Sequence, residues 1–259
     1  MNIRSKFLKE FIKEIQYNNR NPKDLKALEL LNDISTNPER NLSKGTILFR
    51  SRIINDDKDT NREAGFWGLD SRNSFVPPSK LTKDLRANYR YIPYLYCSNH
   101  PYTAIIEVRP RLSAHVSLAS IQVNSNIRLL DFTMQNISSK MSDAKKNLFY
   151  DLSYLYSKPV ADDDDIIDYI PTQYIAEYVK NLGYDGIAYK SSLTPELEGQ
   201  DVMKYPELDR YNIVVFNYKK CAPIKSNKFE VTLNTLECQQ IDGDKNTIEI
   251  YPPHLDFYY

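Results

Sequence analysis

Five side chains that can act on a substrate without a metal lie at or beside predicted strand ends. They are Arg50 in LFRSR, Arg86 in LRAN, Tyr96 in YLYCS, Glu107 in TAIIEVRP and Ser191 in GIAYKSS. Arg52, two residues after Arg50, is a neighbouring candidate. Side chains at strand ends can converge on one cleft, so the sequence predicts a single site built from these residues.

The chemistry that these residue types support is cleavage of a glycosidic bond. An arginine fork binds a diphosphate, and a tyrosine ring stacks on a planar heterocycle. A carboxylate hydrogen-bonds a ribose hydroxyl and stabilises an oxocarbenium-like cation. Nicotinamide on NAD+ is a leaving group of the kind that this chemistry requires. Taken singly, each residue also has an ordinary structural interpretation. Glu107, for example, has Arg109 and Arg111 close by as ion-pair partners.

Other reaction classes lack their usual residues. The chain contains no HExxH, GxSxG, GxGxxG or GxxxxGK[ST] pattern, and its three histidines are isolated. These absences disfavour zinc hydrolysis, histidine-assisted nucleophilic catalysis, and Rossmann or P-loop nucleotide binding. We therefore expect catalysis to rest on Arg, Tyr, Glu and Ser, with no metal. The 34 basic and 34 acidic residues give a net charge of zero, which disfavours a nucleic-acid partner.

The composition is that of a globular protein. The chain has 259 residues, of which 41% are hydrophobic and 26% charged, enough for one large domain. Cys97, Cys221 and Cys238 form no CxxC pair, which indicates reduced thiols and not a disulfide framework. Residues 1–15 lack the apolar core of a signal peptide, and no apolar run approaches the ~18 residues that span a bilayer. We expect a cytoplasmic protein with no membrane partner.

The first 40 residues are predicted to form a helical arm. Ile3, Phe7, Phe11 and Ile15 recur at helical spacing with charged residues between them, and Asn21-Pro22 opens a second helix. A helix lying on a membrane surface is the alternative interpretation of such a basic, amphipathic pattern. Acidic residues interrupt the basic face, which favours packing on the following domain.

From Gly45 onward the pattern changes to that of an α+β core. Strands are predicted at 46–53, 93–98, 115–123, 127–132, 186–189 and 211–216, with helices from Pro101, over 142–156 and from Pro171 to Gly183. Pro is favourable in the first turn of a helix and Gly just after its end, which sets the last of these bounds. Short β-like runs follow at 229–233 and 247–251, and Asp242-Gly243 fits a turn between strands. We predict an arm (1–40), a principal domain (41–225) and a C-terminal β extension (226–259) packed on it.

Two polar segments interrupt this core. Residues 56–78 are predicted to form a long loop, a kind of segment that often serves as a lid or binding loop. Residues 162–165 are four consecutive aspartates. A solvated loop is the favoured interpretation of this run, and a metal-binding cluster is the alternative.

Several of these segments, taken in order, resemble the RES-domain family, which is named for its Arg, Glu and Ser positions. The resemblance extends over roughly residues 45–220. It rests on LFRSR (48–52), LRAN (85–88), IPYLYCSNHPYTAIIEVRP (92–110), YIPTQYIAEYVKNLGYDGIAYKSS (169–192) and YNIVVF (211–216). Each piece is weak alone, but their order and spacing together are specific.

The resemblance implies an ADP-ribosyltransferase-like mixed-sheet fold and NAD+ as the substrate, with no cofactor required. Arg86, Tyr96, Glu107 and Ser191 match the family's active-site positions, and Arg50 matches its early arginine. In this match the two arginines hold the diphosphate, and Tyr96 supports or stacks on the nicotinamide side. Glu107 binds the ribose and stabilises the developing cation, while Ser191 hydrogen-bonds the nicotinamide or its ribose and orders the pocket. Arg109 has no counterpart in the match and is expected to matter much less for binding.

Known relatives include toxins of toxin–antitoxin pairs that degrade NAD+. The resemblance therefore implies an NAD+ glycohydrolase or phosphorylase, with inorganic phosphate as a second substrate of the latter and a cognate antitoxin as partner. A protein ADP-ribosyltransferase, or a non-catalytic interaction module that retains the fold, is the alternative. Two departures from the family pattern bear on the choice. Leu85 replaces a Gly, and Asp209-Arg210-Tyr211 replaces a Gly-rich segment, which affects how closely the backbone can approach a ligand.

Overall fold

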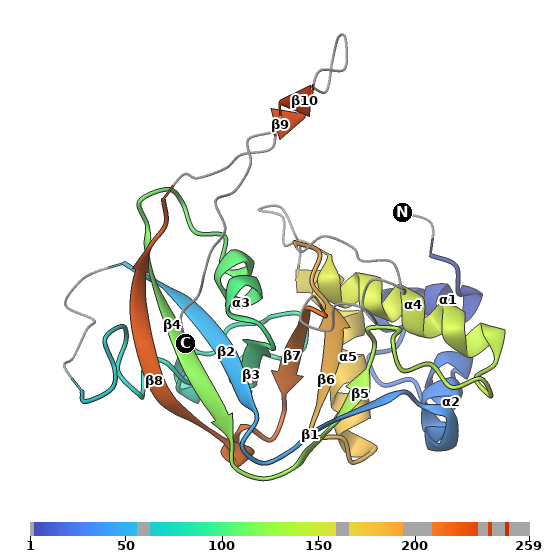
Figure 1. Cartoon of the computed structure of the whole chain (residues 1–259). Coiled ribbons are helices and arrows are strands. Elements are labelled where there is room, and N and C mark those ends of the chain that lie inside the picture. Colours follow the sequence, from blue (N-terminus) through green and yellow to red (C-terminus); the bar gives the residue numbers. More distant parts are fainter. Residues whose placement is uncertain are drawn as a thin grey trace.

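A mixed eight-stranded sheet, in the order β1-β5-β6-β7-β3-β2-β4-β8, forms the centre of the molecule (Figure 1). The computed structural model describes residues 3–55, 63–158, 166–193, 209–232, 238–239 and 247–248. Only β5 and β6 pair in parallel among the strands of this sheet. The strands are β1 Glu39–Leu42, β2 Ile47–Ile54, β3 Leu95–Ser98, β4 His115–Val123, β5 Ile127–Asp131, β6 Gly186–Lys190, β7 Tyr211–Val215 and β8 Cys221–Glu230. The α+β fold with a mixed sheet is as the sequence predicts.

The centre of the sheet is buried on both faces. All five residues of β7 are buried, as are the first four of β6. Gly186 is needed where these two strands meet, because a Cβ there would lie 2.2 Å from the carbonyl oxygen of Val214. Strands covered on both faces read as continuous apolar runs. A polar residue such as Asn212 in β7 therefore stands out.

Five helices accompany the sheet. They are α1 Lys6–Tyr17, α2 Lys26–Asn32, α3 Pro101–Glu107, α4 Asp143–Ser157 and α5 Ile166–Asn181. Figure 1 shows α1, α2, α4 and α5 gathered over the half of the sheet that contains β5 and β6, while α3 lies by β2 and β3. Helices and sheet enclose one large apolar cluster, and a second cluster fills the opposite face. None of the described helices is long and apolar enough to cross a membrane.

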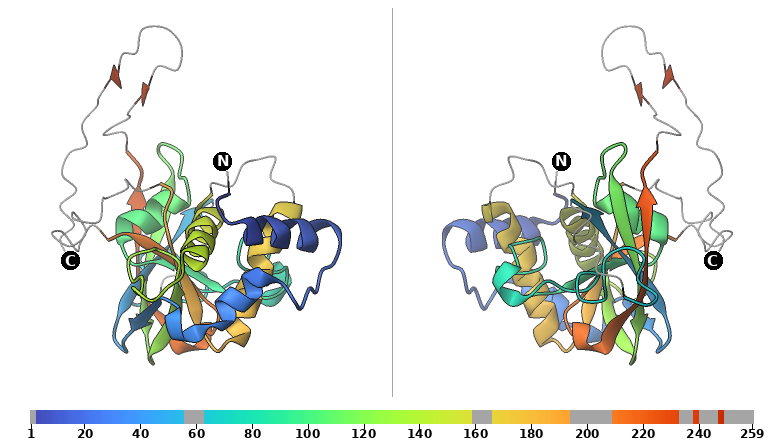
Figure 2. Two further views of the ribbon diagram at one scale, coloured as in Figure 1. Left: turned by 90° about the vertical axis from the view of Figure 1, so that its right-hand side faces the viewer. Right: turned by 90° about the vertical axis from the view of Figure 1, so that its left-hand side faces the viewer.

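The N-terminal helical arm is present and packs tightly. Leu8, Phe11 and Ile15 of α1 are at most 1% exposed and belong to the large apolar cluster that α4 and α5 also line. Figure 2 shows α1 lying beside α5. Ser5 begins α1: its hydroxyl accepts a hydrogen bond from the backbone N–H of Leu8. The backbone N–H of Ser5 donates to Asp151 of α4 at 2.7 Å. The arm thus shares its core with the sheet, as its apolar stripe predicts.

The predicted start of the last long helix is wrong. Helix α5 begins at Ile166, and Pro171 lies inside it and not in its first position. A proline there cannot donate to the carbonyl four residues earlier, that of Ile167. The side-chain amide of Gln16 in α1 donates to this carbonyl at 3.0 Å. The arm therefore satisfies the group that Pro171 leaves without its helical partner.

Strand prediction fails at both ends of the sheet. Strand β1, which pairs with β5, was not expected, because ERNL is polar. The β-like run placed at 229–233 is the end of a longer strand, β8, that begins at Cys221. A separate pair of short strands, β9 Cys238–Gln239 and β10 Thr247–Ile248, forms a two-stranded sheet. The turn expected between them at 242–243 and the aspartate run at 162–165 lie outside the described residues.

Candidate active site

A cavity of about 560 Å³ opens between α3, the end of α4 and the strands β2, β3, β6 and β7. Its size falls within the range of small-molecule binding sites. Of the five predicted site residues, Arg50, Arg86, Tyr96 and Glu107 line it, whereas Ser191 does not and its neighbour Ser192 does. Arg109, Lys158 and Asn212 also line it and were not expected there.

Glu107 is the carboxylate of the cavity, at the C-terminal end of α3. Its Oε1 accepts a hydrogen bond from the Ser191 hydroxyl at 2.6 Å and another from Asn212 Nδ2 at 2.6 Å. Oε2 accepts no hydrogen bond from the described part of the chain. Both donors are uncharged, so they orient the carboxylate without neutralising it. Ser191, which follows β6, thus contacts the carboxylate of Glu107 and does not itself line the cavity. Its expected contact with nicotinamide or ribose stays a prediction.

Asn212 is a site residue that the sequence analysis missed. Its Oδ1 accepts from the hydroxyl of Ser98, on the adjacent strand β3, at 2.6 Å. This contact fixes which end of the amide faces Glu107. The signal in the sequence is an asparagine within an otherwise apolar and aromatic strand, YNIVV. A buried amide in a central strand must be hydrogen-bonded, and here its partner is the carboxylate of the cavity.

Arg50 contributes a desolvated cation to the same cavity. One guanidinium nitrogen donates to the carbonyl oxygen of Tyr96 at 3.4 Å, whereas Nε has no partner among the described residues. Burial lowers the pKa of Arg50, and no carboxylate in the described part of the chain forms an ion pair with it. Arg50 is half-buried, and a partly desolvated cation of this kind gains free energy when an anion binds beside it.

Arg86 lies on a tight turn whose ends are Leu85 and Asn88. The backbone N–H and C=O groups of these two residues bond each other at 3.1 and 3.3 Å. The side-chain amide of Gln173, from α5, donates to both of their carbonyl oxygens at 2.9 Å. Arg86 is 9% exposed and its guanidinium carbon lies 5.2 Å from the ring centre of Tyr169. Gln173 thus holds the turn that presents Arg86, a role that sequence reasoning missed.

Tyr96 does more for this turn than the family match implies. Its hydroxyl donates to Asn88 Oδ1 at 2.8 Å and accepts from the backbone N–H of Ala87 at 3.1 Å. Burial raises the pKa of this hydroxyl, so it stays protonated and keeps donating at neutral pH. The ring lines the cavity, while the hydroxyl positions the turn that carries Arg86.

Arg52 is not part of this arrangement. Its side chain is exposed and donates to the carbonyl oxygen of Asn73 at 2.7 Å. It does not line the cavity that Arg50 lines. The structure therefore separates the two arginines that the sequence alone left as neighbouring candidates.

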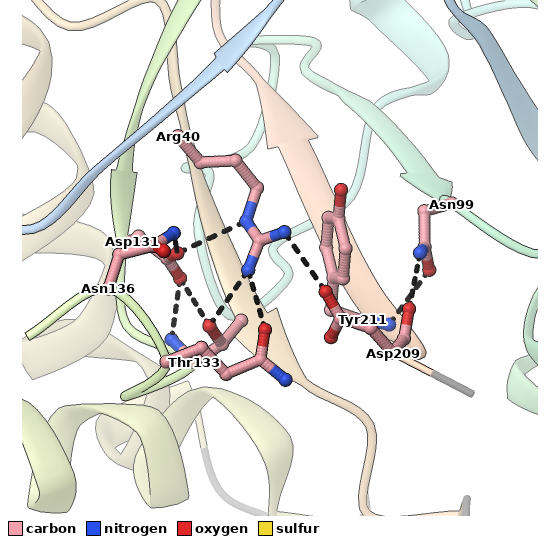
Figure 3. A network of polar contacts seen from close by, with 8 residues as sticks. Arg40, Asn99, Asp131, Thr133, Asn136, Asp209 and Tyr211 are labelled. Carbon is pink, nitrogen blue, oxygen red and sulfur yellow. Dashed lines mark hydrogen bonds and ion pairs between the residues drawn. The ribbon is translucent and has the colours of Figure 1, made fainter. Parts of the chain in front are cut away.

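Both departures from the family pattern are accommodated. Leu85 is not among the described residues with a positive φ, so its position does not require glycine. Asp209 and Tyr211 belong to the polar network of Figure 3. Asp209 forms an ion pair with Arg40 of β1 at 3.1 Å, and the Arg40 guanidinium lies 4.1 Å from the ring centre of Tyr211. Asn99 bonds the backbone of both residues, which holds the start of β7 and hence Asn212 in place.

The described residues contain no cluster of His, Cys, Asp and Glu that could hold a metal ion. The cavity's own groups are cations, one carboxylate and neutral hydrogen-bonding side chains. The fold and the cavity together define an α+β protein with a candidate anion-binding active site.

The sequence profile of the RES domain family matches residues 52–233. This range is well over half of the chain, and the chain therefore belongs to the RES domain family. A similar solved structure is the M. tuberculosis MbcT–MbcA toxin–antitoxin complex. The identity is 12%, the match covers 80% of this chain and 93% of that chain, and the TM-score is 0.45. No curated protein matches the chain.

Proposed function

We propose that the cavity binds NAD+ and cleaves its bond between nicotinamide and ribose. The observation that carries the proposal is the meeting, in one cavity, of Glu107 and Arg50. Glu107 is held by two neutral donors, and Arg50 is a half-buried cation with no carboxylate partner among the described residues. Membership of the RES domain family supports the same activity.

The charges of the cavity suit a diphosphate. Among the described residues, four cationic side chains line it and Glu107 is the one acidic lining residue. They are Arg50, Arg86, Arg109 and Lys158. Arginine recognises phosphate oxygens through its planar fork, and desolvation strengthens that attraction. The aromatic rings of Tyr96, Tyr156 and Tyr189 supply apolar surface for a planar heterocycle in the same cavity.

Glu107 supplies the electrostatic part of the reaction. When the bond from the ribose C1′ to the nicotinamide nitrogen breaks, its electron pair leaves with nicotinamide, which becomes neutral. Positive charge then develops on the ribose ring. A carboxylate whose position is fixed by Ser191 and Asn212 stabilises that charge without reorganising. An oxygen of the acceptor then forms the new bond to C1′, and when the acceptor is water one of its protons is released to the solvent.

Water and inorganic phosphate are the two acceptors that we propose, giving ADP-ribose or its 1-phosphate. Among the described lining residues, cations outnumber carboxylates, which supports phosphate as a second anionic ligand. Transfer of ADP-ribose to a protein side chain is the enzymatic alternative. A fold retained without activity is the other alternative, because fold alone does not define function.

The test is to incubate the purified protein with NAD+, with and without phosphate, and to follow released nicotinamide. We expect release, together with ADP-ribose or its 1-phosphate. A labelled macromolecule in place of free ADP-ribose would indicate protein ADP-ribosylation. Absence of nicotinamide release under all these conditions would favour the non-catalytic alternative.

We further propose that this activity makes the chain a toxin with a cognate antitoxin, as the family resemblance implies. Expression of the wild-type chain in bacteria should then lower cellular NAD+ and arrest growth. Expression of Glu107→Gln should do neither. Growth arrest by the variant would separate any toxicity from cleavage of NAD+.

A further inference from the structure

Arg109 lines the cavity although the sequence analysis placed it outside the site. It lies two residues after Glu107, where the chain leaves α3. Its backbone has a φ of 45°, in the left-handed region that residues with a Cβ rarely adopt. Its N–H donates to the carbonyl oxygen of Ile106 at 2.9 Å, which closes the end of the helix.

Glycine is the residue that this backbone position favours. A helix commonly ends on a left-handed residue, and glycine adopts that conformation without steric cost. Position 109 instead holds a long, branched cation whose side chain reaches the cavity. Non-glycine residues in strained conformations concentrate at functional sites, where the strain is retained because the side chain is needed.

Ser113 provides the matched comparison within the same segment. It also has a left-handed backbone, with a φ of 57°, and its N–H donates to the carbonyl oxygen of Val231 at 2.8 Å. It does not line the cavity. Left-handed geometry alone therefore does not mark a site in this chain. The combination of that geometry with a cation on the cavity wall singles out Arg109.

We propose that Arg109 is a substrate-binding residue that recognises a phosphate group of the dinucleotide. This inference rests on the proposed function. Arg50 comes from β2, Arg86 from the turn at 85–88 and Arg109 from the end of α3. Three elements would then each present one arginine to the same anionic part of the ligand. Because Arg109 is itself the left-handed residue at the end of α3, its position is fixed relative to that of Glu107, two residues earlier.

The test separates the side chain of Arg109 from its backbone. NAD+ is titrated calorimetrically into the protein in a Glu107→Gln background, where cleavage is suppressed. We expect Arg109→Gly to bind NAD+ about 10- to 100-fold more weakly, the range for loss of a hydrogen bond to a charged group. The glycine keeps the left-handed backbone available, so the fold and Tm should be preserved. Arg109→Lys keeps the positive charge but lacks the guanidinium fork. Its affinity for NAD+ should lie between that of the background protein and that of Arg109→Gly.

Two controls complete the design. Ser113→Gly makes the same backbone change outside the cavity, and Arg111→Ala removes a nearby exposed cation. Both should bind NAD+ as the background protein does. Wild-type affinity in Arg109→Gly would overturn the inference, as would an equal loss in Arg109→Gly and Arg111→Ala. If the background protein and the wild type both fail to bind NAD+, the proposed function itself falls, and the inference falls with it.

Discussion

Two carboxylates of this molecule, Asp131 and Glu107, each accept more than one hydrogen bond. They differ in whether those bonds occupy both oxygens and whether a cation balances the negative charge. Asp131, fully buried at the end of β5, accepts from Thr133 and Asn136 and pairs with Arg40, so both of its oxygens are occupied (Figure 3). Glu107 accepts two bonds on one oxygen, both from neutral donors, at the wall of a cavity. The number of hydrogen bonds does not separate a structural carboxylate from a candidate catalytic one. What separates them is that Arg40 balances the charge of Asp131, whereas one oxygen of Glu107 accepts no hydrogen bond from the described part of the chain.

The largest effect that we expect on stability comes from Asp131→Asn. An amide NH2 would oppose the Arg40 guanidinium or the donors of Thr133 and Asn136, and Arg40 would lose its buried partner. Breaking a buried ion pair costs about 3–5 kcal/mol of unfolding free energy. Denaturant unfolding measures this loss. The KM for NAD+ of the folded protein should stay near that of the wild type, and a large rise in KM would place Asp131 in the site.

Glu107→Gln should show the opposite pattern. The substitution keeps the size of the side chain and removes the negative charge that we expect to face the developing cation. Loss of one such stabilising group lowers the rate by about 10²–10³. Initial rates of nicotinamide release measure the loss, and denaturant unfolding should show a stability close to that of the wild type. Near-wild-type turnover would remove Glu107 from the role assigned to it.

Much of the fold and several candidate site residues could be predicted from the sequence, because their signals are local to each segment. The strands and the arm follow from the spacing of apolar residues, which the backbone geometry of each element dictates. Glu107, Arg50 and Arg86 could be chosen because their chemical types suit one reaction and their motifs resemble one family. Their convergence on one cavity is the part that the structure adds.

What escaped prediction depends on contacts between distant segments. Strand β1 is polar and forms because it pairs with β5, and Arg40 within it is neutralised by Asp131 and Asp209. Pro171 is tolerated inside α5, where Gln16 of the arm donates to a carbonyl that lacks its helical partner. Arg109 could not be placed because its direction depends on a left-handed backbone at the end of α3. None of these features has a periodic signal in its own segment.

Arg50 and Arg52 allow a similar comparison for substrate binding, between a residue that lines the cavity and one that does not. Arg50→Ala removes a half-buried cation from the cavity, whereas Arg52→Ala removes an exposed one that lies outside it. We expect the first to weaken NAD+ binding about 10- to 100-fold, and the second to leave it within about twofold. Arg86→Ala should resemble Arg50→Ala. Calorimetric titration measures all three, and equal losses at positions 50 and 52 would indicate a diffuse basic surface and no clamp.

The smallest effect that we expect concerns the helix that carries Glu107. Nδ1 of His100 accepts a hydrogen bond from the backbone N–H of Tyr102 at the start of α3, which requires the neutral ring. Burial, together with the charge of Arg210, lowers the pKa of His100 from 6.5 to about 4.

Because the unfolded chain binds this proton at a higher pH than the native protein does, the contribution of His100 to stability is fully present above pH 6.5. It is lost as the pH falls from 6.5 to about 4. His100→Asn supplies an oxygen that accepts the same bond and does not titrate. Its Tm should therefore fall less than that of the wild type between pH 7 and pH 4.5. His115→Asn, at the start of β4, is the control for losing a histidine elsewhere. An equal fall in Tm for His100→Asn and the wild type would show that protonation of His100 does not destabilise the start of α3. The position of Glu107, at the other end of α3, would then not depend on this histidine.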